Sequence, residues 1–140
     1  MGRRLELIMK VRNLERRSAT SGLPVVSLED FFQGNSDLGS IGCNLVAHPG
    51  PQFFFEVLKA VREDAMVQDV LVEVNEIAND PETWPFSDRV YVLSSATTDD
   101  IRSWLKRLQP DEVTEGWANG MPPGAPSLKP GAKVYSVWWD

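Results

Sequence analysis

The stretch "DVLVEVNEIANDPETWPFSDRVYVLSS", residues 69–95, decides the fold class because it holds two strand patterns separated by a loop. In residues 69–77, positions 70, 72 and 74 are all valine. This spacing of two residues is the period of a β-strand with one apolar face. Residues 89–95 form a second run rich in β-branched and aromatic side chains, and the intervening 78–88 segment carries two prolines. We therefore expect two strands that pair with each other around this loop.

Helices are predicted on both sides of these strands. Residues 97–108, "TTDDIRSWLKRL", have apolar side chains at helical spacing, and Thr97 with Asp100 has the spacing of a capping box. Residues 51–64, "PQFFFEVLKAVRED", also form an apolar stripe, and Pro51 suits the first turn of a helix, where its missing N–H has no partner to lose. Both segments should pack an apolar face on the sheet.

Two outer strands complete the predicted order. Residues 41–47, "IGCNLVA", are apolar enough for a short first strand, and residues 133–140, "KVYSVWWD", alternate as a last strand. From about residue 41 the expected order is strand, helix, strand, strand, helix, strand, which is the order of a ferredoxin-like plait. The fold class is thus predicted as α+β with plait topology, and the part between the last helix and the last strand is expected to be irregular.

The N-terminal segment, residues 1–22, is predicted as a basic helical extension of one domain that spans the whole chain. Its apolar residues Leu7, Val11 and Leu14 have the i, i+4, i+7 spacing of one helical face, although "LELIMKV" is also compatible with a strand. A Pro/Gly-rich loop is expected at residues 121–132.

Composition and charge favour a folded acidic protein. The chain has 140 residues, 42% of them hydrophobic, which is sufficient for one core. Its net charge is −6, but residues 1–17 hold six of the 14 basic and two of the 20 acidic residues, so the rest carries −10. Such a body should attract a basic protein partner and repel nucleic acid. The basic segment could bind this acidic body or a phosphate polymer, and the former is favoured.

Localisation and cofactors follow from what the sequence lacks. It shows no apolar run of membrane-spanning length and no secretory signal pattern, and Cys43 is its only cysteine, so we expect a cytoplasmic protein without membrane contact. One cysteine and one histidine, His48, do not suffice for a Cys/His zinc site. No metal or other cofactor is predicted, and the oligomeric state is left open.

The segment 34–48 is the candidate small-ligand site. It combines glycines with polar side chains and the only thiol and imidazole of the chain; the candidate ligand-binding residues are Asn35, Asp37, Ser40, Cys43 and His48. A thiol and an imidazole can act as nucleophile and base if they meet in space. The favoured interpretation is a glycine-hinged turn whose polar side chains bind neighbouring backbone, with a packed cysteine and a loop histidine.

A second candidate surface is acidic and rich in tryptophan. Of five tryptophans, Trp104 belongs to a helix stripe, while adjacent Trp138 and Trp139 must face opposite sides of a strand, one of them covered by the Pro-rich segment or by a partner. The predicted interface residues are Trp84, Glu73, Glu76, Trp117, Trp138 and Trp139. A carboxylate pair in this region could serve acid/base chemistry, but a solvated acidic rim is the favoured interpretation.

No sequence motif fixes a reaction, so the predicted function is that of a non-enzymatic acidic protein that binds another protein. In charge and size the chain resembles bacterial immunity proteins, which neutralise basic toxins, and this resemblance implies a basic protein partner. "SIGCNL", "WPFSD", "EGW" and "WWD" resemble signatures of a small bacterial protein family. The alternatives are a small-ligand protein or enzyme with its site at 34–48, and nucleic-acid binding through the basic helix.

Overall fold

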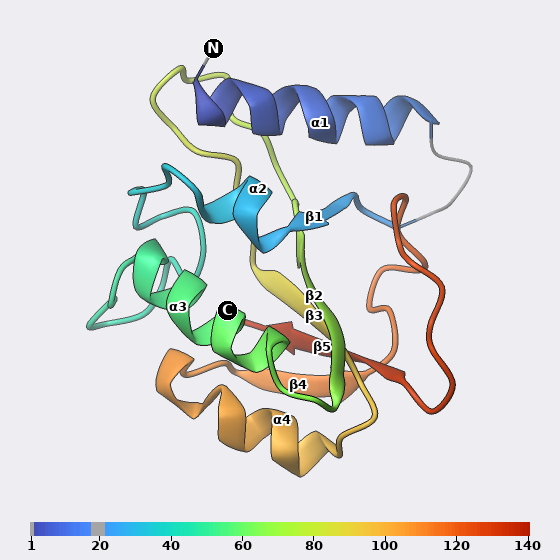
Figure 1. Cartoon of the computed structure of the whole chain (residues 1–140). Coiled ribbons are helices and arrows are strands. Elements are labelled where there is room, and N and C mark those ends of the chain that lie inside the picture. Colours follow the sequence, from blue (N-terminus) through green and yellow to red (C-terminus); the bar gives the residue numbers. More distant parts are fainter. Residues whose placement is uncertain (1, 18–21) are drawn as a thin grey trace.

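A computed structural model describes residues 2–17 and 22–140, which form a five-stranded antiparallel sheet with helices on one face (Figure 1). The strand order is β1-β2-β3-β5-β4. The strands are β1 (Val25–Ser27), β2 (Val67–Glu73), β3 (Arg89–Ser94), β4 (Glu112–Glu115) and β5 (Lys133–Trp138). The predicted pairing of the two strands in residues 69–95 is confirmed, since β2 and β3 are antiparallel neighbours in the middle of the sheet.

The helices begin where the local chemistry favours them. They are α1 (Arg3–Arg17), α2 (Leu28–Phe32), α3 (Pro51–Arg62), α4 (Thr98–Trp104) and a single 3-10 turn, η1 (Lys106–Leu108). The capping box is confirmed, because Thr97 accepts from the Asp100 amide and the Asp100 carboxylate accepts from the Thr97 amide. Pro51 is the first residue of α3, as predicted. The predicted 97–108 helix therefore exists as α4 followed by η1.

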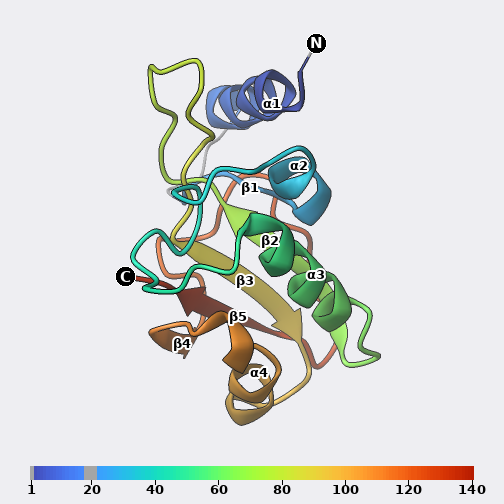
Figure 2. The same ribbon diagram turned by 90° about the vertical axis from the view of Figure 1, so that its left-hand side faces the viewer.

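The face of the sheet that the helices cover is apolar from edge to edge. One valine from each strand lies directly opposite the next, and we call this set the valine row: Val26, Val72, Val90, Val137 and Val113. These side chains join fully buried residues of the helices, including Phe31, Phe54 and Ile101, in one core. Figure 2 shows α2 and α3 along one side of the β2–β3 strands, with α4 below them. Burial of this continuous apolar layer is the main source of stability.

The N-terminal helix docks on the domain. Leu7 and Val11 are 2% exposed and belong to the main core. Lys10 pairs with Asp30 of α2 at 2.5 Å, and the Arg4 guanidinium donates to backbone carbonyls of the loop between β2 and β3. The basic segment thus contacts its own body, which was the favoured interpretation, and the alternative of a strand at its start is wrong.

The plait topology is not confirmed; only the coarser α+β class is. Residues 41–47 contain turns and no strand, because Gly42 adopts a positive φ of 62° and the Leu45 amide bonds back to Gly42. Ile41 is fully buried all the same, so its apolar character reflects packing outside the sheet. Two short strands that were not predicted, β1 and β4, form the edges instead. None of the helices in the described part of the chain is long and apolar enough to cross a membrane.

Candidate functional site on the helix-free sheet face

The opposite face of the sheet carries polar and charged side chains in register. A second row of side chains lies one residue along each strand from the valine row. It consists of Glu73 on β2, Arg89 on β3, Trp138 on β5 and Glu112 on β4, each directly opposite the next. We call these four residues the charged row. The apolar residues buried on this face come from the strands, with Trp117 packed against them, and none comes from a helix among the described residues.

Glu73 is the most unusual residue of the charged row, because it is a carboxylate that is only 1% exposed. The Tyr91 hydroxyl donates to Glu73 Oε1 at 2.8 Å, and Asn119 Nδ2 lies 3.2 and 3.1 Å from the two carboxylate oxygens. Arg89 Nε stands 3.6 Å from Oε2, and the Arg89 guanidinium also donates to the Ser136 hydroxyl. All three partners of the Glu73 carboxylate are donors or cations, so a charged Glu73 is well supported once buried.

Burial nevertheless dominates the protonation of this group. Desolvation raises the pKa of Glu73, although the hydrogen bonds from Tyr91 and Asn119 and the charge of Arg89 oppose the shift. The Tyr91 pKa is raised as well, first by burial and then by the neighbouring Glu73 charge. A raised carboxyl pKa is common at catalytic sites, but here the group is buried and bonded to its own protein. The arrangement fits a structural tie better than a general acid or base.

The segment between β4 and β5, residues 116–131, covers this network, and we call it the strap. In Figure 1 it rises, orange to red, beside the sheet towards β1 before it returns to β5. The Trp117 ring packs edge-on against the Tyr91 ring, with 4.7 Å between the ring centroids. The Asn119 amide donates a hydrogen bond to Glu73. Further along, a Cβ placed on Gly22 would lie 2.4 Å from the Gly120 carbonyl oxygen, so the strap passes in direct contact with Gly22. These contacts, all from residues 117–120, place the first part of the strap on the helix-free face, and the Pro/Gly-rich loop predicted at residues 121–132 follows it.

Beyond the strap, the partly exposed Trp138 adjoins four acidic residues, one of which holds its indole N–H. Its indole Nε1 donates to Asp88 Oδ2 at 3.3 Å, its carbonyl accepts from the Asp111 amide, and Glu112 lies opposite it on the edge strand. The Asp140 amide donates to Asp111 Oδ2 at 2.7 Å, which adds a fourth carboxylate. We call these five residues the Trp138 patch. The second oxygen of Asp88 is buried and has no partner within the described structure.

The other predicted interface residues have different surroundings. Trp84 and Trp139 are 7% and 1% exposed, so they belong to the core, and Trp139 donates its indole N–H to the Leu108 carbonyl. Glu76 is exposed and forms an isolated bridge with Phe86. Of the six predicted residues, Glu73, Trp117 and Trp138 therefore share the helix-free face, and their role at an interface stays a prediction.

In the 34–48 segment, the predicted ligand oxygens bind the chain itself. Asn35 and Ser40 are 1% exposed and hydrogen-bond each other at 2.9 Å. The two carboxylate oxygens of Asp37 accept from the Gly39 and Trp84 amides. These contacts match the turn interpretation and tie the loop to the segment before β3.

His48 and Cys43 do not form a nucleophile–base arrangement. His48 Nδ1 accepts from the Gly50 amide at 2.8 Å, so Nε2 carries the proton and donates to the Ile41 carbonyl at 2.6 Å. Both ring nitrogens are thus occupied. Cys43 is exposed, and the expectation that it is packed is wrong because the 41–47 turns leave its side chain outside the core.

A resident metal has no obvious ligands in the part of the chain that the structure describes. No three His, Cys, Asp or Glu side chains there come together as a metal site would require.

The fold and the two faces of the sheet define a small α+β protein with its main core on one side and, on the other, a smaller apolar cluster next to the charged row. The chain belongs to the Uncharacterized protein YfbO family, whose model matches residues 3–137. A protein described as Uncharacterized protein YfbO, from Escherichia coli (strain K12), is 37% identical over 118 residues, covering 84% of this chain and 83% of its own length. No solved structure matches the chain.

Proposed function

We propose that this protein is a non-catalytic binding protein whose Trp138 patch engages a basic segment of another protein. The observation that carries the proposal is the partly exposed indole of Trp138, whose N–H donates to Asp88, with Glu112 opposite it on β4 and Asp111 and Asp140 beside its backbone. An aromatic face among carboxylates is suited to an Arg or Lys side chain, which can stack on the ring while it pairs with the acids.

The energetics of such a contact would divide between two kinds of residue. Trp138 is the anchor, because tryptophan is among the side chains that dominate protein interfaces. The exposed carboxylates mainly accelerate association and choose a basic partner over an acidic one. The net charge of −6 acts in the same direction over a longer range, and this steering weakens as salt increases.

The nature of the polar groups supports binding over catalysis. Glu73, a buried carboxylate whose pKa is raised by desolvation, is enclosed by Tyr91, Arg89 and Asn119. The polar side chains of the 34–48 segment are likewise committed to internal hydrogen bonds. A binding surface needs neither group to be free.

The test is to recover a basic partner from the native cell at low salt and to measure its affinity for variants of the patch. Trp138→Leu should weaken binding about tenfold or more, which is the scale of an interface anchor. Glu112→Gln should slow association at low salt and have a smaller effect at high salt. Glu63→Gln removes an exposed carboxylate at the end of α3 and is the matched control.

Circular dichroism and urea unfolding should first show that each variant is folded. The proposal fails if no basic protein is recovered at low salt. It also fails if the recovered partner binds Trp138→Leu as tightly as the unaltered protein.

A further inference from the structure

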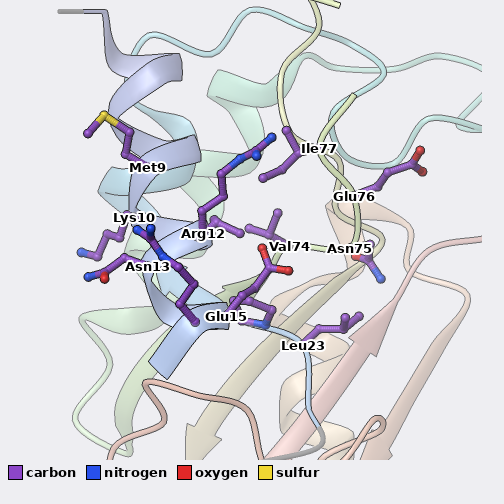
Figure 3. A pocket seen from close by; sticks show the side chains of 13 residues that line it. Met9, Lys10, Arg12, Asn13, Glu15, Leu23, Val74, Asn75, Glu76 and Ile77 are labelled. Carbon is purple, nitrogen blue, oxygen red and sulfur yellow. The ribbon is translucent and has the colours of Figure 1, made fainter. Parts of the chain in front are cut away.

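A groove lies between α1 and the segment that continues β2, and its lining residue Asn75 accepts a hydrogen bond from the Asp88 amide. It is lined by α1, by Leu23 and Pro24, and by residues 74–77, and its volume is about 990 Å³. That volume is at the upper end of the range of small-molecule sites in proteins. Figure 3 shows the Arg12 side chain extending from α1 towards Ile77.

The floor of the groove is apolar. Val74 is 3% exposed and belongs to the main core, while Leu23 and Ile77 are partly exposed beside it. An apolar surface of this kind gains free energy when a hydrocarbon chain or ring replaces water over it. The floor alone would not distinguish one apolar ligand from another.

The charges of the groove supply that distinction. Arg12 and Arg16 are one helical turn apart on α1, line the groove, and form no ion pair with a described residue. Lys10 instead serves to dock the helix through Asp30, and in Figure 3 it points away from the groove, as does the Glu76 carboxylate. With Glu15 as the remaining acid of the lining, two cations face one anion.

We propose that this groove binds an amphipathic organic monoanion, such as a medium-chain carboxylate, with its apolar part on Leu23, Val74 and Ile77 and its anionic group at Arg12 and Arg16. Arg12, Arg16 and Glu15 together give the groove one net positive charge, which matches the single negative charge of the ligand. A polyphosphate would be repelled by Glu15 and by the acidic body, and a neutral ligand would leave the arginines unused.

The test is a titration of the ¹⁵N-labelled protein with sodium octanoate, followed by amide chemical shifts, with 1-octanol and inorganic pyrophosphate as comparison probes. Octanoate should give saturable shifts centred on Leu23 and residues 74–77. 1-Octanol should bind at least several-fold more weakly, and pyrophosphate should not shift these amides.

The decisive variant is Arg12→Gln/Arg16→Gln, because both side chains are exposed and their loss leaves the core intact. It should weaken octanoate binding about tenfold, which corresponds to the loss of two exposed ion pairs. Arg102→Gln/Lys106→Gln removes two exposed cations at α4 and η1 and should bind as the unaltered protein does. Equal binding by the Arg12/Arg16 variant, tighter binding of 1-octanol or pyrophosphate, or shifts centred elsewhere would each overturn the proposal.

Discussion

The two faces of the sheet are built from the same strands, yet they differ in almost every physical respect. The valine row and the charged row are offset by one residue, so the alternation of each strand separates them. The valine row is sealed by helices that bury phenylalanine and leucine. On the other face the strap covers Glu73 and Tyr91 through a few specific contacts and leaves Trp138 and Glu112 of the charged row beyond it. Stability is therefore expected to reside on one face and adjustable recognition on the other.

The largest effect should come from the helix-covered face. Phe31→Ala removes a fully buried ring of α2 and should lower the free energy of unfolding by about 3–5 kcal/mol, because a cavity remains in the core. Urea unfolding followed by circular dichroism measures the loss. Phe31→Leu, which keeps most of the volume, should recover a large part of it. A loss below about 1 kcal/mol would show that this face is not the main source of stability.

A smaller loss is expected when the strap loses its aromatic contact. Trp117→Ala removes a partly buried ring that packs on Tyr91. It should lower the free energy of unfolding by about 1–2 kcal/mol. The same unfolding measurement applies, and proteolysis within residues 116–131 should become faster. If Trp117→Ala were as destabilising as Phe31→Ala, the contrast between the faces would be lost.

The polar contact of the strap should contribute less again. Asn119→Ala deletes the amide that donates to both oxygens of Glu73, and the expected cost is about 1 kcal/mol. Asn79→Ala, at an exposed position in the loop between β2 and β3, is the control and should stay within about 0.5 kcal/mol of the unaltered protein. Equal values for the two variants would contradict a role for Asn119 in holding the strap.

The most subtle difference between the faces concerns pH. Glu29 of α2 forms a bidentate pair with Arg62 of α3, and this pair lowers the pKa of Glu29 from 4.5 to about 2. Burial shifts the pKa of Glu73 the other way, to above 4.5. The lowered pKa of Glu29 in the folded state adds stability that is present above pH 4.5 and is lost as the pH falls towards 2. The raised pKa of Glu73 has the opposite effect, because its contribution to stability is lost as the pH rises through the pKa of the folded state.

Two variants separate these contributions. The stability difference between the unaltered protein and Glu29→Gln should shrink as pH falls from 4.5 towards 2. The corresponding difference for Glu73→Gln should shrink as pH rises above 4.5, because the unaltered protein must then ionise a buried carboxyl. Urea unfolding at a series of pH values measures both. If the two stability differences changed in the same direction with pH, one of the two carboxyl groups would have been assigned the wrong environment.

Sequence patterns were sufficient where an element is stabilised by its own residues. The apolar stripes of α1 and α3 and the cap of α4 are local features, and all three helices were predicted. The strands β2, β3 and β5 alternate strongly and were also predicted. In contrast, β4 has the sequence "EVTE" and becomes a strand only because β5 lies beside it. The apolar run at 41–47 was mistaken for a strand because burial of Ile41 does not require a sheet.

The candidate site was harder to predict because it depends on register. Glu73, Trp117 and Trp138 were selected as interface residues, but Arg89, Tyr91 and Asn119 were not, although they surround Glu73. The alternation of "RVYVLS" does place Arg89 and Tyr91 on one face. Only the pairing of β3 with β2 and β5 shows which residues they meet. The contact of Asn119 depends on the path of the strap, for which no periodic pattern exists.

The position of β5 has a consequence for how the chain folds. It follows all other described strands in the chain, yet it lies inside the sheet, between β3 and β4. During synthesis, β4 therefore emerges before the only strand it pairs with, and the apolar β3 keeps an open edge until β5 arrives. The sheet cannot be completed until β5 pairs with β3 and β4, and these contacts join residues separated by the length of the strap. Such long-range contacts slow folding. A nascent chain that stalls before residue 133 would expose that edge to other chains, so the interval before β5 appears is when this protein is most prone to aggregate.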